Sequence, residues 1–472
     1  MTLFNSLGLA QPTLPKPKAA GSFDIGGVTA INPASDRAGD ATISISGGTI
    51  GRIARGVPSN PASEYAGCFV VPGLVDMHVH LPPKNALPLT RHAMLMYLAH
   101  GVTSLREAGD LDGTAVDAAR TARDSDGWPC PRVVSCGPFV GAGKPTFKNT
   151  ITLTDGSDCE ADAIARRVRA TGATFMKFYD GLTEPMIRTL ERACDKHGLA
   201  IMGHVPAALT YEQARIREVQ HFFGVPRPDT LERPGLINRS CDWHAVDERR
   251  MDEIVAFTLR EGIANTPTLV TNEASLSYLD FQGACARLVL RRIPPFYPDI
   301  IWHPVRGGLN SRLPQDYTKR QVSAAVSKKQ QLTRKLFDAG APLYLGTDVA
   351  QPFVLPGESL QKEMRLFAGA GIPLDAIWRL ATSAAGSRLG IPKLGTIQPG
   401  APADLLIFRK DPTLSLDHLD TLVAIVCAGR LYNKATLDET LDAFGAYFRS
   451  PIVRPLAARA AKQSMARALG RT

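Results

Sequence analysis

Eight apolar, strand-like runs alternate with helical stretches between residues 69 and about 385, and this alternation constrains the fold more than any other feature of the sequence. Parallel strands need a long crossover, usually a helix, so the alternation indicates βα units and an α/β protein. Eight such units in one continuous segment predict a closed (β/α)8 barrel of the TIM type rather than an open sheet. The predicted strands are 69–76, 102–107, 132–139, 174–180, 199–204, 218–222, 264–269 and 342–348.

The two ends of the chain have a different sequence pattern from the barrel segment. Short β-rich pieces separated by Gly, Asn and Asp turns are typical of a small antiparallel sheet, and they occur before and after the barrel segment. Because 472 residues exceed the usual size of one hydrophobic core, we expect both ends to join in a composite β-sandwich domain. The predicted organisation is a leader at 1–21, sandwich segments at 22–68 and 391–435, the barrel at 69–390 and a C-terminal helical extension at 436–472.

The composition is that of an ordinary globular protein, with 44% hydrophobic and 21% charged residues. No apolar stretch is long enough to cross a membrane, so we expect no membrane association. The eight cysteines lack paired spacing, which favours reduced thiols and a cytoplasmic location. Part of the net charge of +9 lies in a basic tail at 449–471, which we interpret as a solvated or subunit-packing helix. No aromatic residues interleave with its basic ones, so we do not expect nucleic acid as a partner.

His78-Val79-His80 closes the first predicted barrel strand. Residues two apart in a strand face the same side, so both imidazoles can reach one point where the strand ends. Zinc-type ions take four or more ligands, and catalytic groups of such barrels lie at the C-terminal ends of the strands. A single histidine or aspartate there is more often a hydrogen-bonded core residue or a helix cap, but their joint occurrence predicts a metal centre. The candidate ligands are His78, His80, Lys177, His204, His221 and Asp348.

Lys177 lies in an apolar strand pattern, residues 173–180, that places its side chain inside the barrel. A buried ammonium is costly without a partner, whereas desolvation lowers the pKa of an amine and makes it nucleophilic. Such an amine can trap carbon dioxide as a carbamate, and the resulting anion can bridge two cations. The alternative interpretation is an ordinary lysine at a strand end that pairs with an acid such as Asp180.

A set of short motifs becomes informative when its members are taken together. They are Pro72 to His80, the strand around Lys177, Gly203-His204-Val205-Pro206, Gly346-Thr347-Asp348, Pro356 to Leu360, Gly395-Thr396-Ile397 and Ala403-Asp404-Leu405. Over about residues 22–435 the chain resembles the amidohydrolase superfamily, in particular its imidazolonepropionase-like and prolidase-like branch. The motifs are specific for the superfamily, and they say little about the substrate.

The resemblance implies a binuclear centre of two divalent ions, usually zinc, although mixed imidazole and carboxylate ligands also suit manganese, cobalt or iron. It implies that carbon dioxide or bicarbonate carboxylates Lys177, and that Asp348 accepts a proton from the bridging hydroxide and returns it to the leaving amine. A homo-oligomer is also expected. The implied ligands are His78, His80 and Asp348 for the more buried ion, His204 and His221 for the other, and carboxylated Lys177 as the bridge.

Two stretches depart from the family pattern. Relatives commonly carry an acid before the sixth-strand histidine, where this chain has Gln220, and a histidine-containing loop where it has 137–144. We therefore expect the pocket to differ from that of relatives on the side of the 137–144 loop. Residues 271–320 are long for a βα connection and are interpreted as a lid over the barrel mouth. The candidate substrate contacts are Tyr179, His303 and Arg306.

The leading functional hypothesis is metal-dependent hydrolysis of a C–N amide bond in a small molecule by a metal-bridging hydroxide. The substrates considered are an N-acyl amino acid, a dipeptide or an aryl amide, including xenobiotic ones. Hydrolysis of a cyclic amide, such as a lactam or imidazolone, or of an ester is the first alternative. A one-metal deaminase would lack a bridging lysine, so Lys177 argues against it. A non-catalytic scaffold of the same fold is the alternative outside enzymes, and the complete ligand set argues against it.

Overall fold

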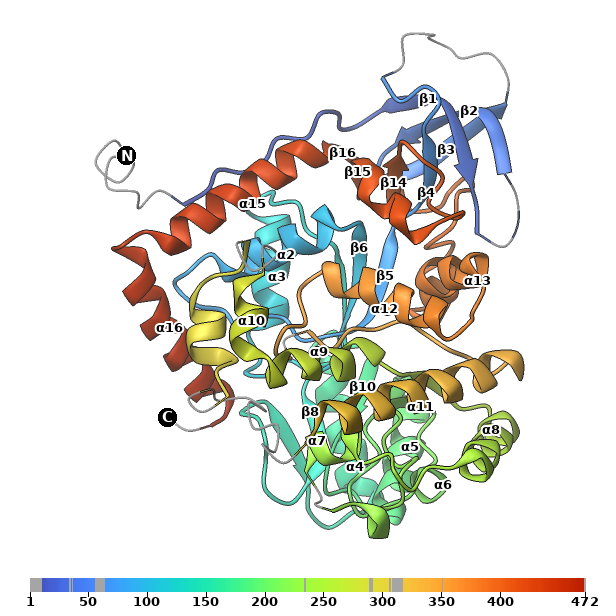
Figure 1. The fold of residues 1–472 in the computed structure, drawn as a ribbon, viewed down its shortest axis with the longest axis vertical. Coiled ribbons are helices and arrows are strands. Elements are labelled where there is room, and N and C mark those ends of the chain that lie inside the picture. The colour runs from blue at the N-terminus through green and yellow to red at the C-terminus, as the bar shows by residue number, and fades with distance from the viewer. Residues whose placement is uncertain are drawn as a thin grey trace.

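The computed structural model describes residues 11–33, 35, 37–55, 64–232, 235–287, 292–304, 307, 317–349 and 351–470. In Figure 1 the barrel and its helices fill the centre and lower half of the molecule, and a small β-domain projects at the upper right. Two C-terminal helices run along the opposite side, so that segments from both ends of the chain border the barrel.

The core of the molecule is a parallel barrel, as the alternation of strands and helices predicts. Its strands are β5 (Leu74–Val79), β6 (Val102–Glu107), β7 (Arg132–Ser135), β10 (Phe175–Phe178), β11 (Ala200–Gly203), β12 (Glu218–Gln220) and β13 (Ala264–Thr266). Every paired neighbour among them is parallel. Their residues are buried almost throughout, since helices cover the outer face and side chains fill the interior.

Hydrogen bonds outside the regular ladders join these strands into a ring. The N–H of Thr174, just before β10, donates to the carbonyl of Ser135 in β7 at 3.2 Å. Residues 343–349 supply the eighth segment, which is bridged in parallel to Asn265 of β13 on one side and to Val79 of β5 on the other. The predicted (β/α)8 barrel is therefore confirmed, with an irregular last strand.

Two predicted barrel strands are each divided in the structure. The run 69–76 splits at Gly73 into β4 (Phe69–Pro72), which belongs to the small domain, and β5. A Cβ at Gly73 would lie 2.1 Å from the hydroxyl of Thr103, and the Gly73 N–H donates to the carbonyl of Asp404, so the chain turns where only glycine fits. The run 132–139 likewise breaks into β7 and β8 (Phe139–Ala142), which pairs with β9 (Thr150–Leu153).

Helices cover the outside of the barrel, and several begin or end at residues of the expected type. Ser157 and Asp247 cap α4 and α8, and left-handed Gly198 and Gly262 end α5 and α8. In the described residues no helix is both long and apolar enough to cross a membrane. The α-helices are α2 (Leu89–Ala99), α3 (Ala115–Asp124), α4 (Asp158–Ala170), α5 (Glu184–His197), α6 (Tyr211–Ala214), α7 (Leu236–Cys241), α8 (Glu248–Glu261), α9 (Leu269–Leu279), α10 (Phe281–Ala286), α11 (Lys319–Asp338), α12 (Glu358–Gly369), α13 (Leu374–Arg379) and α14 (Ala385–Arg388).

The small domain is a seven-stranded sheet built from both ends of the chain, in the order β16-β15-β14-β4-β1-β2-β3. The sheet folds over on itself, because the N–H of Ile50 donates to the carbonyl of Ala401 at 2.8 Å, and both halves contribute to one apolar core. The remaining strand bounds are β1 (Phe23–Ile31), β2 (Arg37–Ser46), β3 (Thr49–Arg55), β14 (Leu405–Phe408), β15 (Leu422–Cys427) and β16 (Arg430–Asn433).

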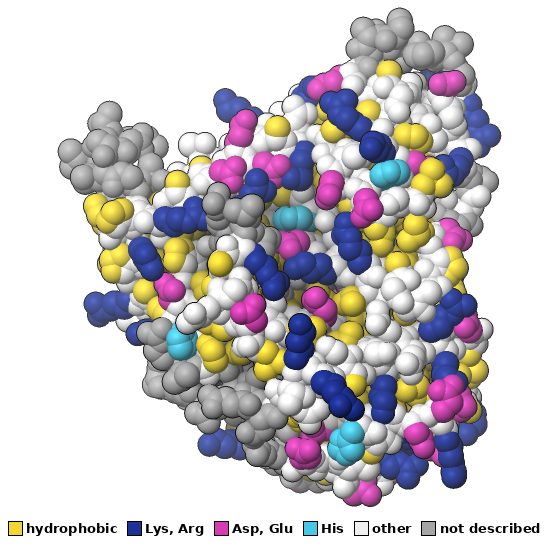
Figure 2. Space-filling view, in the orientation of Figure 1, with side chains coloured by type: hydrophobic (Ala, Val, Ile, Leu, Met, Phe, Trp, Pro, Cys, Tyr) yellow, Lys and Arg dark blue, Asp and Glu magenta, His cyan; other side chains and the backbone are white. Residues whose placement is uncertain are grey.

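The C-terminal helices α15 (Lys434–Arg449) and α16 (Val453–Ala468) pack along the barrel. Ion pairs tie them to the segment that follows residue 291: Arg292 pairs with Asp438 at 2.6 Å, and Asp299 pairs with Arg454 at 3.0 Å. On the face in Figure 2, basic and acidic side chains are interspersed. Among the surface ion pairs, Lys335 pairs with both Glu248 and Asp252 of α8.

A buried ion network crosses the barrel interior. Glu218 of β12 accepts hydrogen bonds from Arg106 of β6 and, at 2.8 Å, from Arg388 of α14. Although burial raises the pKa of a carboxyl group, the two guanidinium groups outweigh it and lower the pKa of Glu218 to about 2. The Glu218 carboxylate therefore stabilises the fold above its ordinary pKa of 4.5, and that contribution is lost as the pH falls towards 2.

Replacing Glu218 by glutamine is expected to destabilise the protein by about 3–5 kcal/mol, because the buried Arg106 and the partly buried Arg388 lose their counter-charge. The measurement is the midpoint of thermal unfolding, compared at pH 7 and pH 3. The deficit of the variant should shrink at pH 3, where the wild-type carboxylate also begins to lose its advantage. Glu248→Gln, at an exposed ion pair, should change little at either pH. An equal deficit at both pH values would contradict the role of the carboxylate charge.

Candidate metal centre

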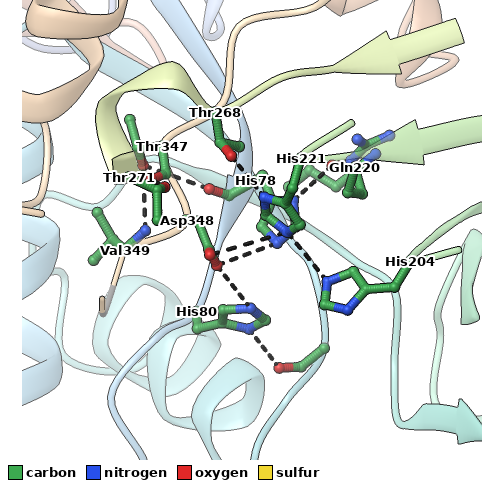
Figure 3. Close-up of polar contacts among 12 residues, drawn as sticks. His78, His80, His204, Gln220, His221, Thr268, Thr271, Thr347, Asp348 and Val349 are labelled. Atoms are coloured by element: carbon green, nitrogen blue, oxygen red, sulfur yellow. Dashed lines mark hydrogen bonds and ion pairs between the residues drawn. The ribbon is translucent and has the colours of Figure 1, made fainter. Parts of the chain in front are cut away.

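The structure brings the six predicted ligand residues to the carboxyl ends of the barrel strands. His78 lies in β5 and His80 just after it, Lys177 lies in β10, and His204 and His221 directly follow β11 and β12. Asp348 lies in the irregular last strand, and all six are buried or nearly so. Figure 3 shows the rings of His78, His80 and His221 around the Asp348 carboxylate, with the ring of His204 beside that of His221.

Asp348 is the centre of this arrangement. Its Oδ1 atom lies 3.4 Å from Nε2 of His78 and 3.3 Å from Nε2 of His80, and its Oδ2 atom lies 4.0 Å from Nε2 of His221. Ligand atoms of His78, His221 and Asp348 all lie within 4.8 Å of one another, close enough to share one ion. The predicted grouping put His80 rather than His221 in this set, and His80 is equally near the carboxylate.

The distances between ligand atoms fit a metal ion. Nε2 of His204 and Nε2 of His221 lie 3.1 Å apart, and two nitrogens bound to one tetrahedral zinc ion would lie about 3.3 Å apart. Nε2 of His78 is buried without a hydrogen-bond partner among the described residues. Buried polar atoms that lack a partner are costly, and a shared cation satisfies such nitrogen lone pairs.

The outer ring nitrogens are fixed by acceptors. Nδ1–H of His80 donates to the carbonyl of Gly109 at 2.9 Å, and Nδ1–H of His78 donates to Oε1 of Gln220 at 2.6 Å. Carbonyl oxygens only accept, so in the neutral form of both rings Nε2 carries the lone pair and faces the carboxylate. This is the tautomer that a metal ligand needs.

Gln220 occupies the position where the family pattern has an acid. Its amide group is oriented by the buried network, because Nε2 of Gln220 donates to Glu218 at 3.0 Å and leaves Oε1 for His78. The charge that an acid would carry at this position lies instead two residues earlier in β12, on Glu218. The sequence departure therefore keeps the hydrogen bond to His78 and moves the negative charge away from the centre.

Lys177 is fully buried, and its Nζ has no hydrogen-bond partner among the described residues. Burial lowers the pKa of this amine to about 8. The alternative pairing with Asp180 is not found, because Asp180 accepts two hydrogen bonds from Arg239, at 2.9 and 3.0 Å. The barrel interior therefore holds a desolvated amine that has no partner among the described residues and lies beside imidazoles.

The charges around the site favour a cation. Burial alone lowers the pKa of His80, but hydrogen bonds to Asp348 and Glu107 outweigh it and raise that pKa to about 9. The pKa of Asp348 lies below its ordinary value, since the neighbouring His221, His80 and Lys177 offset the effect of burial. A field that attracts a proton to His80 attracts a divalent ion to the same lone pairs more strongly.

The ligands sit on strained backbone. His221 and Asp348 adopt positive φ values of 63° and 59°, which non-glycine residues rarely do. Hydrogen bonds hold these conformations: Lys329 donates to the carbonyl of His221 at 3.2 Å, and the Asp348 N–H donates to the carbonyl of His78 at 2.7 Å. Such strain is concentrated where side chains must be aimed at a common point.

Of the three predicted substrate contacts, the structure places Tyr179 nearest the centre, with its ring 4.7 Å from that of His204. It packs in an aromatic cluster with Phe139 and Phe147 and is nearly fully buried. The ring of His303 lies against Phe281 at 5.5 Å. Arg306 lies outside the described residues.

Sequence reasoning missed several side chains that orient the ligands. Glu107 lies 3.5 Å from His80 and accepts the N–H of Leu81, and Thr268 lies 2.6 Å from Nδ1 of His221. The charged pair Arg106-Glu107 at the end of the predicted barrel strand 102–107 was a usable signal. For Thr268, in a Thr-Pro-Thr turn, the sequence carries no comparable signal.

A parallel eight-stranded barrel that gathers histidines, an aspartate and a lysine at its carboxyl end defines a class of hydrolases that act on C–N bonds and are generally metal-dependent. The chain belongs to the Amidohydrolase family, whose model matches residues 69–433. No curated protein sequence matches the chain.

Solved structures share the fold at low sequence identity. Bottromycin amidohydrolase is similar with a TM-score of 0.70 and 22% identity, covering 91% of each chain. A Xaa-Pro dipeptidase with bound methionine in its active site has a TM-score of 0.61 and 19% identity, covering 88% of this chain and 100% of the other. The ochratoxinase of A. niger has a TM-score of 0.60 and 14% identity, covering 88% and 96%.

Proposed function

We propose that the protein is a binuclear-metal-dependent hydrolase that cleaves the amide C–N bond of a small molecule, such as an N-acyl amino acid, a dipeptide or an aryl amide. The observation that carries this proposal is the convergence of three imidazoles on Asp348, with His204 beside His221, near the unpaired amine of Lys177. The names of the structural neighbours, a dipeptidase among them, favour an amide over an ester.

Two groups of side chains would hold the ions, most suitably zinc. His78, His80 and Asp348 would hold one, and His204 and His221 the other, with Lys177 between the groups. When bound, the ions would lower the pKa of a water molecule towards neutrality and polarise the scissile carbonyl. The imidazole tautomers fixed by Gly109 and Gln220 leave lone pairs free for this purpose.

Lys177 would supply the bridge after carboxylation. The neutral amine attacks the carbon of carbon dioxide, an N–C bond forms, one C=O bond electron pair moves to oxygen, and nitrogen releases a proton. With a pKa of about 8, roughly a tenth of the amine is neutral at pH 7, far more than for an ordinary lysine. The product carries one negative charge and two oxygen ligands, which suits a position between two cations.

Asp348 would move the proton. An amide nitrogen is a poor leaving group unless it is protonated, so one group must accept the proton of the attacking water and deliver it to nitrogen. Asp348 lies among the candidate ligands, and its lowered pKa keeps it able to accept a proton near neutral pH. Its fixed backbone holds the carboxylate in place during this transfer.

The proposal is tested by amine release from N-acyl amino acids, dipeptides, aryl amides, lactams and esters, with zinc and bicarbonate supplied. Turnover of linear amides that stops after chelation and returns with zinc is the expected result. Activity confined to lactams or esters would move the function to ring opening or ester hydrolysis. Full activity after exhaustive removal of metal would overturn the proposed mechanism.

Replacing Gln220 by leucine is expected to weaken zinc binding by about 10- to 100-fold, because His78 loses the acceptor that fixes its tautomer. The measurement is the zinc dissociation constant from competition with a chromogenic chelator, which needs no substrate. Gln361→Leu is the matched control, since Gln361 donates to a carbonyl far from the site, that of His100. Equal zinc affinity in Gln220→Leu and wild type would refute the orienting role.

A further inference from the structure

A small cavity lies directly beside His80, between helix α2, residues 293–302 and residues 349–356. Its volume is about 40 Å³, room for roughly three water-sized groups. Its wall is mainly apolar and includes Ala93, Val349 and Val354. Because His80 forms part of this wall, the cavity borders the candidate metal centre.

Two hydrogen-bond donors in the wall of the cavity have no partner. The hydroxyl of Tyr97 and the indole N–H of Trp302 are both buried, and neither meets an acceptor among the described residues. By contrast, Trp128 on the other side of α2 donates to the carbonyl of Arg91 at 3.0 Å. An unsatisfied buried donor costs about 1–3 kcal/mol, so a pair of them in one cavity points to a ligand that supplies an acceptor.

The wall around these donors is rigid. The carbonyl of Trp302 accepts a hydrogen bond from the hydroxyl of Tyr278. Arg292, which precedes the 293–302 segment, is tied to α15 through Asp438 at 2.6 Å. A rigid wall favours a group of one size and shape, because the cavity cannot adjust to a larger one.

The position of the cavity indicates which substituent of the scissile amide it would bind. Val349, in the wall of the cavity, directly follows Asp348, so the cavity lies beside the segment that carries the proposed proton donor. A substituent on that nitrogen is therefore nearest the cavity. The acyl substituent points away from Asp348 when the nitrogen faces it.

We propose that this cavity binds the amine-side substituent of the substrate. This substituent is a short aliphatic group that carries one hydrogen-bond acceptor, such as an ether oxygen, a thioether sulfur or a carbonyl oxygen. The inference rests on the proposed function, since it takes Asp348 as the proton donor to the amine. It narrows the substrate class: the amine released has a chain of about three to five heavy atoms.

The size of the cavity is tested with Ala93→Leu, which fills it, and Ala38→Leu, which fills a separate cavity in the small domain. For amides with an amine-side isobutyl or methoxyethyl group, Ala93→Leu should lower kcat/KM by about 30-fold, as expected for a pocket that loses room for a side chain. Amides with an amine-side methyl group should change less than about 3-fold in either variant. An equal loss for both substrates, or a loss that follows the acyl group, would overturn the assignment.

The two donors are tested with Tyr97→Phe and Trp302→Phe, which remove one donor each and keep the ring. The ratio of kcat/KM for a methoxyethyl over a butyl amine-side group should fall by about 10-fold in each variant. An unchanged ratio in both variants would show that the donors do not contact substrate.

A binding measurement separates this inference from the proposed function. Calorimetry with O-methyl-L-homoserine and L-alanine, two amines of the expected and the minimal size, needs no hydrolysis. Wild type should bind the former at least about 10-fold more tightly, and Ala93→Leu should abolish the difference. If this difference is found while no amide is hydrolysed, the proposed function fails and the cavity stands. If amides are hydrolysed while the difference is absent, the cavity assignment fails alone.

Discussion

Replacing Asp348 by asparagine will lower kcat by about 10³-fold, because the carboxylate that accepts and returns the proton is lost. The defect should depend on the leaving group. An alkyl amine must be protonated to depart, whereas a nitroaniline departs with little help, so the loss should be smaller for the nitroanilide. The measurement is kcat for a matched pair of amides that share one acyl group and differ in the amine.

A merely structural role for Asp348 would lower both rates by the same factor. Asp126→Asn, at an ion pair with Arg91 on the surface, controls for the loss of a carboxylate as such and should leave both rates unchanged. Zinc content is measured in parallel, since Asp348 is also a candidate ligand. Equal losses for the two leaving groups would contradict the proton-transfer role.

Replacing Lys177 by alanine is expected to abolish turnover, with a loss of at least about 10³-fold, and to remove the bicarbonate dependence of metal binding. The direct measurement is the carbamate signal of protein exposed to ¹³C-labelled carbon dioxide, observed by NMR. Wild type should show one carbamate, and Lys177→Ala should show none. A persistent carbamate in the variant would mean that another amine is carboxylated.

The same signal has a defined pH dependence. Only the neutral amine reacts, and the pKa of Lys177 is about 8, so the rate at fixed dissolved carbon dioxide should rise about tenfold from pH 6 to 7 and level off above pH 8. An ordinary lysine would keep rising to beyond pH 10. A rate that still rises steeply above pH 9 would contradict the burial argument.

Lys329 is a natural control within the same molecule. It is also fully buried, and burial lowers its pKa to about 7. Its amine, however, donates hydrogen bonds to Oδ1 of Asn272 at 2.5 Å and to the carbonyl of His221. The amine of Lys329 therefore has hydrogen-bond partners, in contrast to that of Lys177. A low pKa alone therefore does not distinguish the two lysines; they differ because Nζ of Lys177 has no hydrogen-bond partner among the described residues.

The sequence predicted the barrel and the place of its ligands because both follow from local periodicity. His78 and His80 share a strand face, and His204, His221 and Asp348 each close an apolar run, so their common end of the barrel could be inferred without coordinates. Whether Lys177 pairs with Asp180 was open from sequence, and the contact of Asp180 with Arg239 answers it.

What the sequence could not supply is contact between distant segments. The break at Gly73 depends on Thr103 and on the carbonyl of Asp404, which is more than three hundred residues away in the chain. The role of Gln220 depends on Glu218 fixing which way its amide faces. Neither is encoded in a local pattern, because each arises when strands become neighbours in the ring.

The C-terminal helix α16 supports the surroundings of the candidate metal centre from outside the barrel. The family match ends at residue 433, yet the carbonyl of Ala468 accepts a hydrogen bond from Lys148, and Ala468 packs in one cluster with Phe139 and Tyr179. Those two aromatic rings lie against His80 and His204. Packing of α16 therefore holds two rings that contact candidate ligands, although α16 contributes no candidate ligand itself. Shortening α16 is expected to loosen the surroundings of His80 and His204 while leaving the barrel strands intact.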